Sequence, residues 1–82
     1  MTHNREDITT RVKAAVATVS GTEASMMKPD TDLVADLDLD SLAMFELVIE
    51  LEEEYGLRIS DEDIERIKTI SDIVSFIERH AG

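Results

Sequence analysis

The stretch DLDLDSL, which begins at Asp36, combines the residue types of this sequence with the most evident chemistry. Its carboxylates and its serine hydroxyl could bind a cation, cap a helix or receive a covalent group. Asp36, Asp38 and Asp40 match positions 1, 3 and 5 of an EF-hand calcium loop. The remaining positions fail, because Ser41 stands where the loop needs glycine and Leu47 where it needs a bidentate glutamate. The sequence therefore predicts no specific metal site, only weak divalent binding by clustered carboxylates.

Ser41 lacks the partners that a catalytic serine needs. A serine hydroxyl becomes a nucleophile when a neighbouring base takes its proton beside an oxyanion hole. The histidines, His3 and His80, lie near the chain ends, and no G-x-S-x-G elbow occurs. The preceding aspartates also disfavour an alkoxide at Ser41. We expect no catalysis by this chain, so that a reaction at Ser41 must be activated by another enzyme.

Helices are the elements that would position this serine. Apolar residues recur at helical spacing from Ile8 to Val19 after Asn4, a plausible N-cap. Residues 21–40 show no sustained period and predict a long ordered loop with one helical turn around Leu33 to Leu37. The next helix begins at Ser41, which we expect to act with Asp40 as its cap. The predicted helices span residues 5–19, 41–55, 61–67 and 70–80.

Capping patterns start the last two of these helices. Ser60 to Asp63 has the capping-box pattern, and Thr69 to Asp72 repeats it. No alternating segment predicts a strand. We therefore expect a single all-α domain over residues 1–82, a small four-helix bundle of three longer helices and a short third helix, with a long loop between the first two.

The segment 41–55 has two apolar faces when residues are placed at about 100° per step. The face expected in the core contains Met44, Leu47, Val48, Leu51 and Tyr55. Leu42, Phe45 and Ile49 fall on the opposite side with Glu46 and Glu53. A helix on a one-layer core cannot bury both faces, so we expect an exposed apolar strip rimmed by carboxylates, which is typical of a partner site. The alternative is that Phe45 or Ile49 packs under the long loop.

The composition limits the classes of partner. The net charge is −11 and the chain has no cysteine, which excludes disulfides and thiolate chemistry. Such a surface repels nucleic acid and anionic membranes and favours basic proteins, although acidity can also serve solubility alone. No apolar run of 18 residues and no signal peptide occur. We expect a cytoplasmic protein, a monomer, with no nucleic acid or membrane partner.

Several of these residues occur in the pattern of a known family: Asp40-Ser41-Leu42, Glu46-Leu47-Val48, Glu52 to Tyr55, Ile59 to Glu62, and Thr69. From about residue 6 to residue 80 the chain resembles acyl carrier proteins. The form Asp-Leu-Asp-x-Asp-Ser-Leu, with Met44 two residues after it, is similar to actinobacterial fatty-acid carriers. The resemblance implies that Ser41, flanked by Asp40 and Leu42, receives 4′-phosphopantetheine from coenzyme A. A separate Mg²⁺-dependent holo-synthase, a phosphopantetheinyl transferase, makes that transfer, and acyl chains are then carried as thioesters.

The resemblance also implies a docking surface and a sheltered acyl chain. The docking surface corresponds to Leu42, Phe45, Glu46, Ile49 and Glu53, with Glu52 and Asp40 at its margins. The lining around the acyl chain should come from core residues such as Leu47, Leu51, Ile59 and Ile67. Three positions depart from the common family pattern: Asp38 replaces a glycine, Ser60 a proline, and Ala43 an acidic or polar residue.

The leading hypothesis is a carrier of fatty-acid synthesis, with basic synthesis enzymes as partners. The same scaffold serves polyketide and aminoacyl or peptidyl pathways. A hypothesis from another class is an acidic interaction module without a prosthetic group, in which Ser41 only caps a helix.

Overall fold

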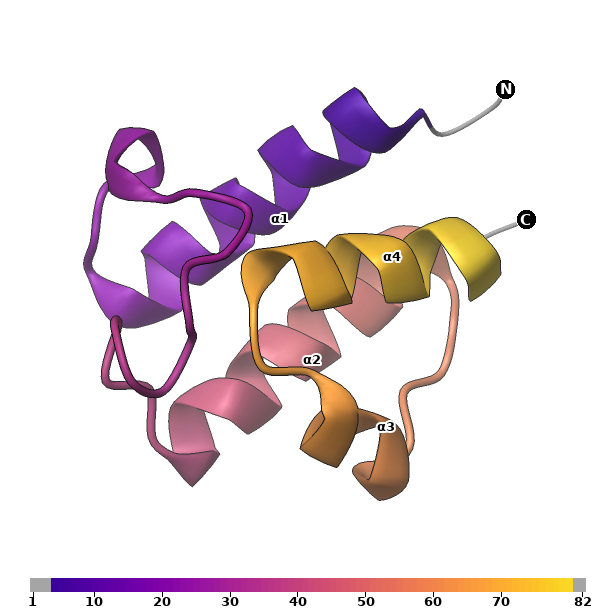
Figure 1. Ribbon diagram of the computed structural model, residues 1–82. Coiled ribbons are helices and arrows are strands. Elements are labelled where there is room, and N and C mark those ends of the chain that lie inside the picture. Colours follow the sequence, from indigo (N-terminus) through magenta and orange to yellow (C-terminus); the bar gives the residue numbers. More distant parts are fainter. Residues whose placement is uncertain (1–3, 81–82) are drawn as a thin grey trace.

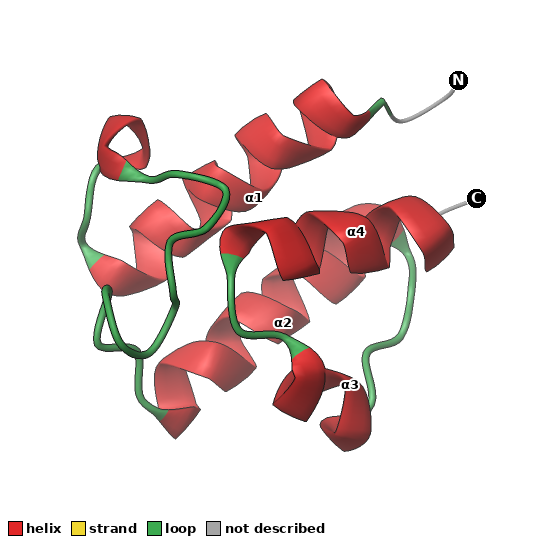
Figure 2. Ribbon diagram, in the orientation of Figure 1, coloured by secondary structure: helices red, strands yellow, loops and turns green. Residues whose placement is uncertain are grey.

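In the computed structural model, which describes residues 4–80, the chain consists of helices joined by loops (Figures 1 and 2). The helices are α1 (Arg5–Ser20), η1 (Ala24–Met26, a 3-10 helix), α2 (Ser41–Tyr55), α3 (Asp61–Arg66) and α4 (Ile70–His80). The described residues contain no strand, so the predicted all-α class with four α-helices is confirmed. Relative to the predicted bounds, α1 is one residue longer and α3 one residue shorter, and η1 was not foreseen.

Side chains next to the helix starts satisfy the free backbone N–H groups there. Asn4 Oδ1 accepts a hydrogen bond from Asp7 N at 2.7 Å. At α3, Ser60 and Asp63 form a reciprocal capping box. At α4, Thr69 Oγ1 accepts from Asp72 N, while Asp72 Oδ2 accepts from the Thr69 and Lys68 N–H groups. The sequence patterns at residues 4, 60 and 69 therefore mark real helix starts.

The core lies between α1, α2 and α4, with α1 in contact with both of the others (Figure 1). Its fully buried side chains include Ile8, Val12, Val16, Leu33, Leu47, Leu51, Ile70, Ile73, Val74 and Ile77. Arg5 fastens α1 to α4 at the surface, because its guanidinium donates to Glu78 Oε1 at 3.0 Å and to Ser71 Oγ at 3.2 Å. Tyr55, predicted in the core, is half-buried and packs against it.

The connection from residue 21 to residue 40 is ordered by its own hydrogen bonds and by bonds to the α3–α4 corner. Leu33 N donates to Lys68 O at 2.8 Å, and Ser71 N donates to Pro29 O at 2.8 Å. The predicted turn near 33–37 occurs as consecutive turns, with Asp36 N donating to Asp32 O. The connection therefore forms a fixed wall beside the start of α2.

Candidate functional site

Ser41 is the first residue of α2, and Asp40 alone is its N-cap. The Asp40 carboxylate accepts from Ala43 N at 2.8 Å, so the expectation that Ser41 shares the capping role is wrong. The Ser41 side chain is exposed, and its hydroxyl has no hydrogen-bond partner among residues 4–80. The cap fixes the helix start while it leaves the serine hydroxyl available to another molecule.

The aspartates before Ser41 have structural roles. Asp36 Oδ2 accepts from Asp32 N at 2.8 Å, which closes the turn, and Asp40 caps α2. Asp38 has φ 57°, the only positive φ outside glycine in the described chain. This is the position where the resemblance leads one to expect glycine, and the left-handed backbone explains that preference because aspartate adopts it only at a cost. No group of three or more metal-ligating side chains lies together among residues 4–80.

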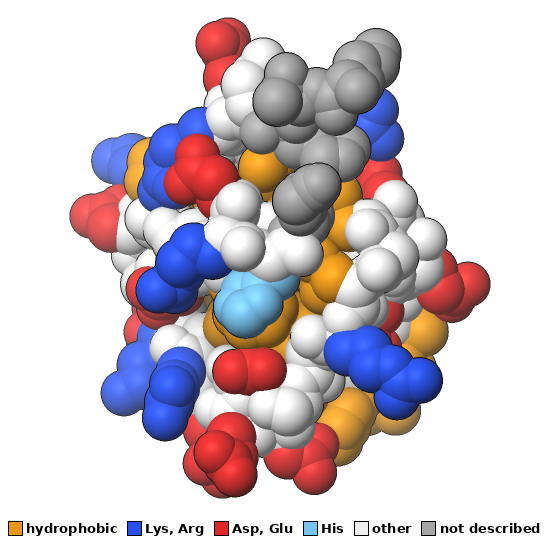
Figure 3. Space-filling view, turned by 90° about the vertical axis from the view of Figure 1, so that its right-hand side faces the viewer, with side chains coloured by type: hydrophobic (Ala, Val, Ile, Leu, Met, Phe, Trp, Pro, Cys, Tyr) orange, Lys and Arg blue, Asp and Glu red, His pale blue; other side chains and the backbone are white. Residues whose placement is uncertain are grey.

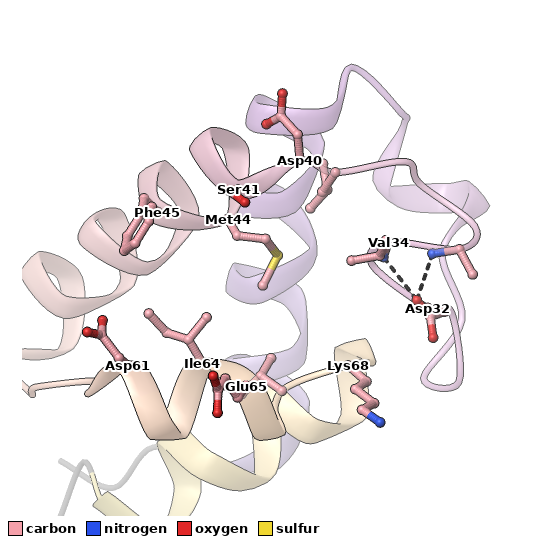
Figure 4. Close-up of a pocket in the computed structure, with 13 residues that line it drawn as sticks. Asp32, Val34, Asp40, Ser41, Met44, Phe45, Asp61, Ile64, Glu65 and Lys68 are labelled. Atoms are coloured by element: carbon pink, nitrogen blue, oxygen red, sulfur yellow. Dashed lines mark hydrogen bonds between the residues drawn. The ribbon is translucent and has the colours of Figure 1, made fainter.

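A groove of about 990 Å³ opens beside Ser41 (Figure 4). Three segments line it: the end of the long connection, the first turns of α2, and α3 with the residues after it. Its apolar lining is Val34, Ala35, Leu39, Met44, Phe45, Ile64 and Ile67, and its polar lining is Asp32, Asp40, Ser41, Asp61, Glu65 and Lys68. The groove thus offers an apolar surface next to an exposed hydroxyl.

The lining expected from the resemblance agrees with this groove at one position. Ile67 lines it, whereas Leu47, Leu51 and Ile59 are buried in the core and do not reach it. Sequence reasoning missed Val34 and Ile64 because each belongs to a segment whose position depends on tertiary contacts. The one sequence signal that could have pointed to Val34 is its apolar character within a polar loop; in the structure its side chain is 59% exposed.

The outer face of α2 carries the exposed apolar strip that the helical spacing predicts. Leu42, Phe45 and Ile49 are 68%, 51% and 52% exposed, so none of them packs under the long connection. A shallow hollow of about 600 Å³ beside Ile49 is lined otherwise by glutamates, namely Glu46, Glu50, Glu53 and Glu54. Glu50 and Glu54 join the predicted Glu46 and Glu53 there. Their spacing of four residues along the helix was the available signal.

Glu52 differs from its expected place at the margin of the docking surface. Its side chain is half-buried, and Oε2 accepts a hydrogen bond from Ile59 N at 2.8 Å. Glu52 therefore holds the connection between α2 and α3, which ends at the buried Ile59. This contact spans seven residues along the chain and depends on the path of that connection.

Charges are mixed on the side of the molecule that Figure 3 shows. Figure 3 shows the side on which both ends of the described chain lie, where basic and acidic side chains alternate around exposed hydrophobic atoms. Helix α2 by contrast has five glutamates and no basic residue.

Near the end of α2, Glu54 pairs with Arg11 at 2.9 Å, and this pair raises the pKa of Arg11. Burial, followed by the charge of Glu54, raises the pKa of Tyr55 above its ordinary value.

The start of α2 suits a phosphodiester on Ser41. Ser41 N and Leu42 N have no hydrogen-bond partner among the described residues, because the Asp40 side chain takes only Ala43 N. Unpaired N–H groups at the positive end of a helix dipole favour a bound anion. The exposed hydroxyl, the two free N–H groups and the adjacent groove therefore fit a prosthetic group that is attached by phosphate and continues as a flexible arm.

Comparisons with known proteins give one consistent result. Residues 10–77 match the family described as "Phosphopantetheine attachment site". An acyl carrier protein of Rhodococcus erythropolis is 38% identical over 79 residues, which cover 96% of this chain and 87% of the relative. The meromycolate extension acyl carrier protein of Mycobacterium leprae is 35% identical over 96% of this chain and 69% of its own. The solved acyl carrier protein of Enterococcus faecalis superposes with a TM-score of 0.80 at 35% identity, covering 96% of this chain and 98% of that structure.

Proposed function

The chain belongs to the acyl carrier protein family, whose prosthetic group is 4′-phosphopantetheine, and from that premise we propose that it carries fatty-acyl chains on an arm attached to Ser41. The prosthetic group supplies a terminal thiol, on which acyl groups form thioesters. The observation that carries the assignment to Ser41 is its exposed, unpaired hydroxyl at the first position of α2, next to two free N–H groups. The protein itself then acts as a carrier rather than as a catalyst.

Loading requires a separate phosphopantetheinyl transferase. Ser41 Oγ forms the new bond to phosphorus, the pyrophosphate bond of coenzyme A breaks, and adenosine 3′,5′-bisphosphate leaves. A base on the transferase takes the hydroxyl proton, since no histidine or lysine side chain among residues 4–80 is hydrogen-bonded to Ser41. Asp40 contributes by fixing the helix start, and Ser41 N and Leu42 N contribute by stabilising the negative phosphodiester.

The outer face of α2 supports docking to basic enzymes. Acyl carriers interact with synthesis enzymes, and the glutamates around Ile49 would steer this chain toward positive patches on them. Leu42, Phe45 and Ile49 then bury apolar surface at short range. Binding should be weak and fast, because a carrier must leave each enzyme in turn.

Fatty-acid synthesis is the pathway that we propose. One relative is named for meromycolate extension, which is consistent with growth of an acyl chain, and the apolar groove beside Ser41 could shelter such a chain. A polyketide or aminoacyl pathway is the alternative. Identification of the acyl group on protein purified from its native host separates them, and an aminoacyl or polyketide thioester would contradict the fatty-acid assignment.

Attachment is tested by intact-mass measurement after incubation with coenzyme A, Mg²⁺ and a broad-specificity phosphopantetheinyl transferase. We expect a mass increase of one phosphopantetheine on the native chain and on Ser25→Ala, an exposed serine in η1, and none on Ser41→Ala. An undiminished increase on Ser41→Ala would contradict the assignment. No increase on the native chain would favour the acidic interaction module.

Docking is tested with matched charge reversals. Glu53→Lys should slow transferase loading about tenfold at low ionic strength, because electrostatic steering sets the association rate. Glu23→Lys makes the same change at an exposed position outside α2 and should have much less effect. Equal slowing by both variants would show that net charge, and not this face, governs the encounter.

A further inference from the structure

Met44 is one of three buried residues that line the groove, together with Leu39 and Ile67. Met44 is 9% exposed and lines the groove, with Phe45 at the rim and Ile64 across from it on α3. Figure 4 shows its thioether pointing from α2 into the space toward α3, on the side of the helix where Ser41 begins the groove.

The core begins behind Met44. Leu47 and Leu51 follow on the same face of α2, one and two turns further, and each is 1% exposed. Neither lines the groove, and neither does the buried Ile59 at the far end of the α2–α3 connection. On α2, Met44 is therefore the last residue of the buried face that lines the groove before the packed interior.

The chemistry of methionine suits a boundary that can shift. Its side chain is unbranched and polarizable, with three rotatable bonds, so it can change rotamer at lower cost than a branched residue. The opposite wall can also give way, because none of the six residues of α3 is buried. Ile67, at 8% exposure, anchors the chain directly after that helix.

We propose that Met44 determines how long an acyl chain this protein can shelter. Chains that end before Met44 lie in the groove, and longer chains must displace its thioether to continue toward Leu47 and Leu51. This inference rests on the proposed attachment at Ser41. It assigns to Met44 a role in specificity for acyl length that the exposed docking strip does not have.

The test uses the holo-protein loaded with even-numbered saturated acyl groups from butyryl to palmitoyl. The readout is the rise in Tm of each acylated form over the holo-form, because a sheltered chain stabilises the fold that binds it. In the native chain we expect the rise to increase with chain length and then to level off. Met44→Ala removes three heavy atoms and should move the levelling point to acyl chains about three carbons longer, since the space they leave can be filled. Met44→Phe should move it to shorter chains.

Met26→Ala is the matched control, because Met26 lies in η1 with 71% exposure. It should leave the levelling point unchanged. A levelling point that is the same in the native chain, Met44→Ala and Met44→Phe would overturn the inference, and so would a Tm rise that does not depend on chain length in the native chain. Failure of the native chain to accept phosphopantetheine would instead overturn the proposed function, so the two failures are distinguishable.

If Met44→Phe fails to fold, NMR keeps the inference falsifiable. The Met44 methyl resonance of the native protein should shift little with short acyl groups and strongly with those beyond the levelling point, while the Met26 methyl stays constant. Equal shifts of the Met44 methyl at all chain lengths would contradict the proposed role.

Discussion

The backbone of Asp38 gives the sharpest test of how the turn before Ser41 is built. Its φ of 57° lies in the left-handed region, which costs an ordinary L-residue about 1–2 kcal/mol and a glycine almost nothing. Glycine in turn loses about 0.5–1 kcal/mol of extra backbone entropy on folding. Asp38→Gly should therefore be more stable than Asp38→Ala by roughly 1 kcal/mol, which corresponds to a Tm difference of about 4–8 °C in a domain of this size.

The assay is thermal unfolding by circular dichroism of the two variants, together with Asp38→Asn. An asparagine at this position would keep the tolerance for left-handed backbone while it removes the charge, so the stability of that variant isolates the electrostatic part. Ala35→Gly is the matched control at a neighbouring exposed position without positive φ, and it should lose about 0.5–1 kcal/mol. An Asp38→Ala variant as stable as Asp38→Gly would show that left-handed backbone at position 38 carries no cost for a residue with a side chain.

Three further predictions concern packing, pH and salt. Leu47→Ala should lower the free energy of unfolding by about 2–5 kcal/mol, because Leu47 is 1% exposed. Leu42→Ala, at a position 68% exposed, should change it by less than about 0.5 kcal/mol. Equal losses for the two variants in urea titrations would contradict the assignment of Leu47 to the buried face and Leu42 to the exposed face. Hydrogen bonds from Ser60 hold the pKa of Asp63 below its ordinary value of 3.8. The contribution of the Asp63 carboxylate to stability is therefore fully present above pH 3.8 and is lost as the pH falls through the lower pKa of the folded state. Asp63→Asn should therefore make Tm fall less steeply on acidification. An acid limb of the Tm–pH curve that is the same in the native chain and in Asp63→Asn would contradict the role of the capping box. Added salt should raise Tm by screening the glutamates of α2, and a Tm indifferent to ionic strength would contradict that repulsion.

The helices were predictable because their signals are local. Asn4, Ser60 and Thr69 cap from positions adjacent to the helices they start, and Gly21 and Gly56 end α1 and α2 with φ of 76° and 63°. Apolar spacing also separated the buried and exposed faces of α2. These features need only neighbouring residues, so a single sequence contains them.

The site was less predictable because it depends on contacts between distant segments. The wall made by residues 32–39 is placed by bonds to the α3–α4 corner, such as Leu33 N to Lys68 O, and no local pattern encodes that pairing. The bond from Ile59 N to Glu52 likewise gives Glu52 a structural contact that no local pattern predicts. The expected lining was drawn from core residues and omitted Met44, which belongs to the same helix face as Leu47 and also lines the groove.

No helix among residues 4–80 is long and apolar enough to cross a membrane. The monomeric state, the cytoplasmic location and the absence of nucleic-acid partners stay predictions from the sequence. Sedimentation equilibrium of the holo-protein checks the first of these, and a concentration-dependent dimer would contradict it.

The central claim is that Ser41 carries the phosphopantetheine arm. The most direct measurement is fragmentation mass spectrometry of the proteolytic peptides that contain Ser41 and the other serines, prepared from protein loaded by the transferase. We expect the full modification on Ser41 and none on Ser25, Ser60 or Ser71. A modification at any other residue, or an unmodified Ser41 in loaded protein, would contradict this claim.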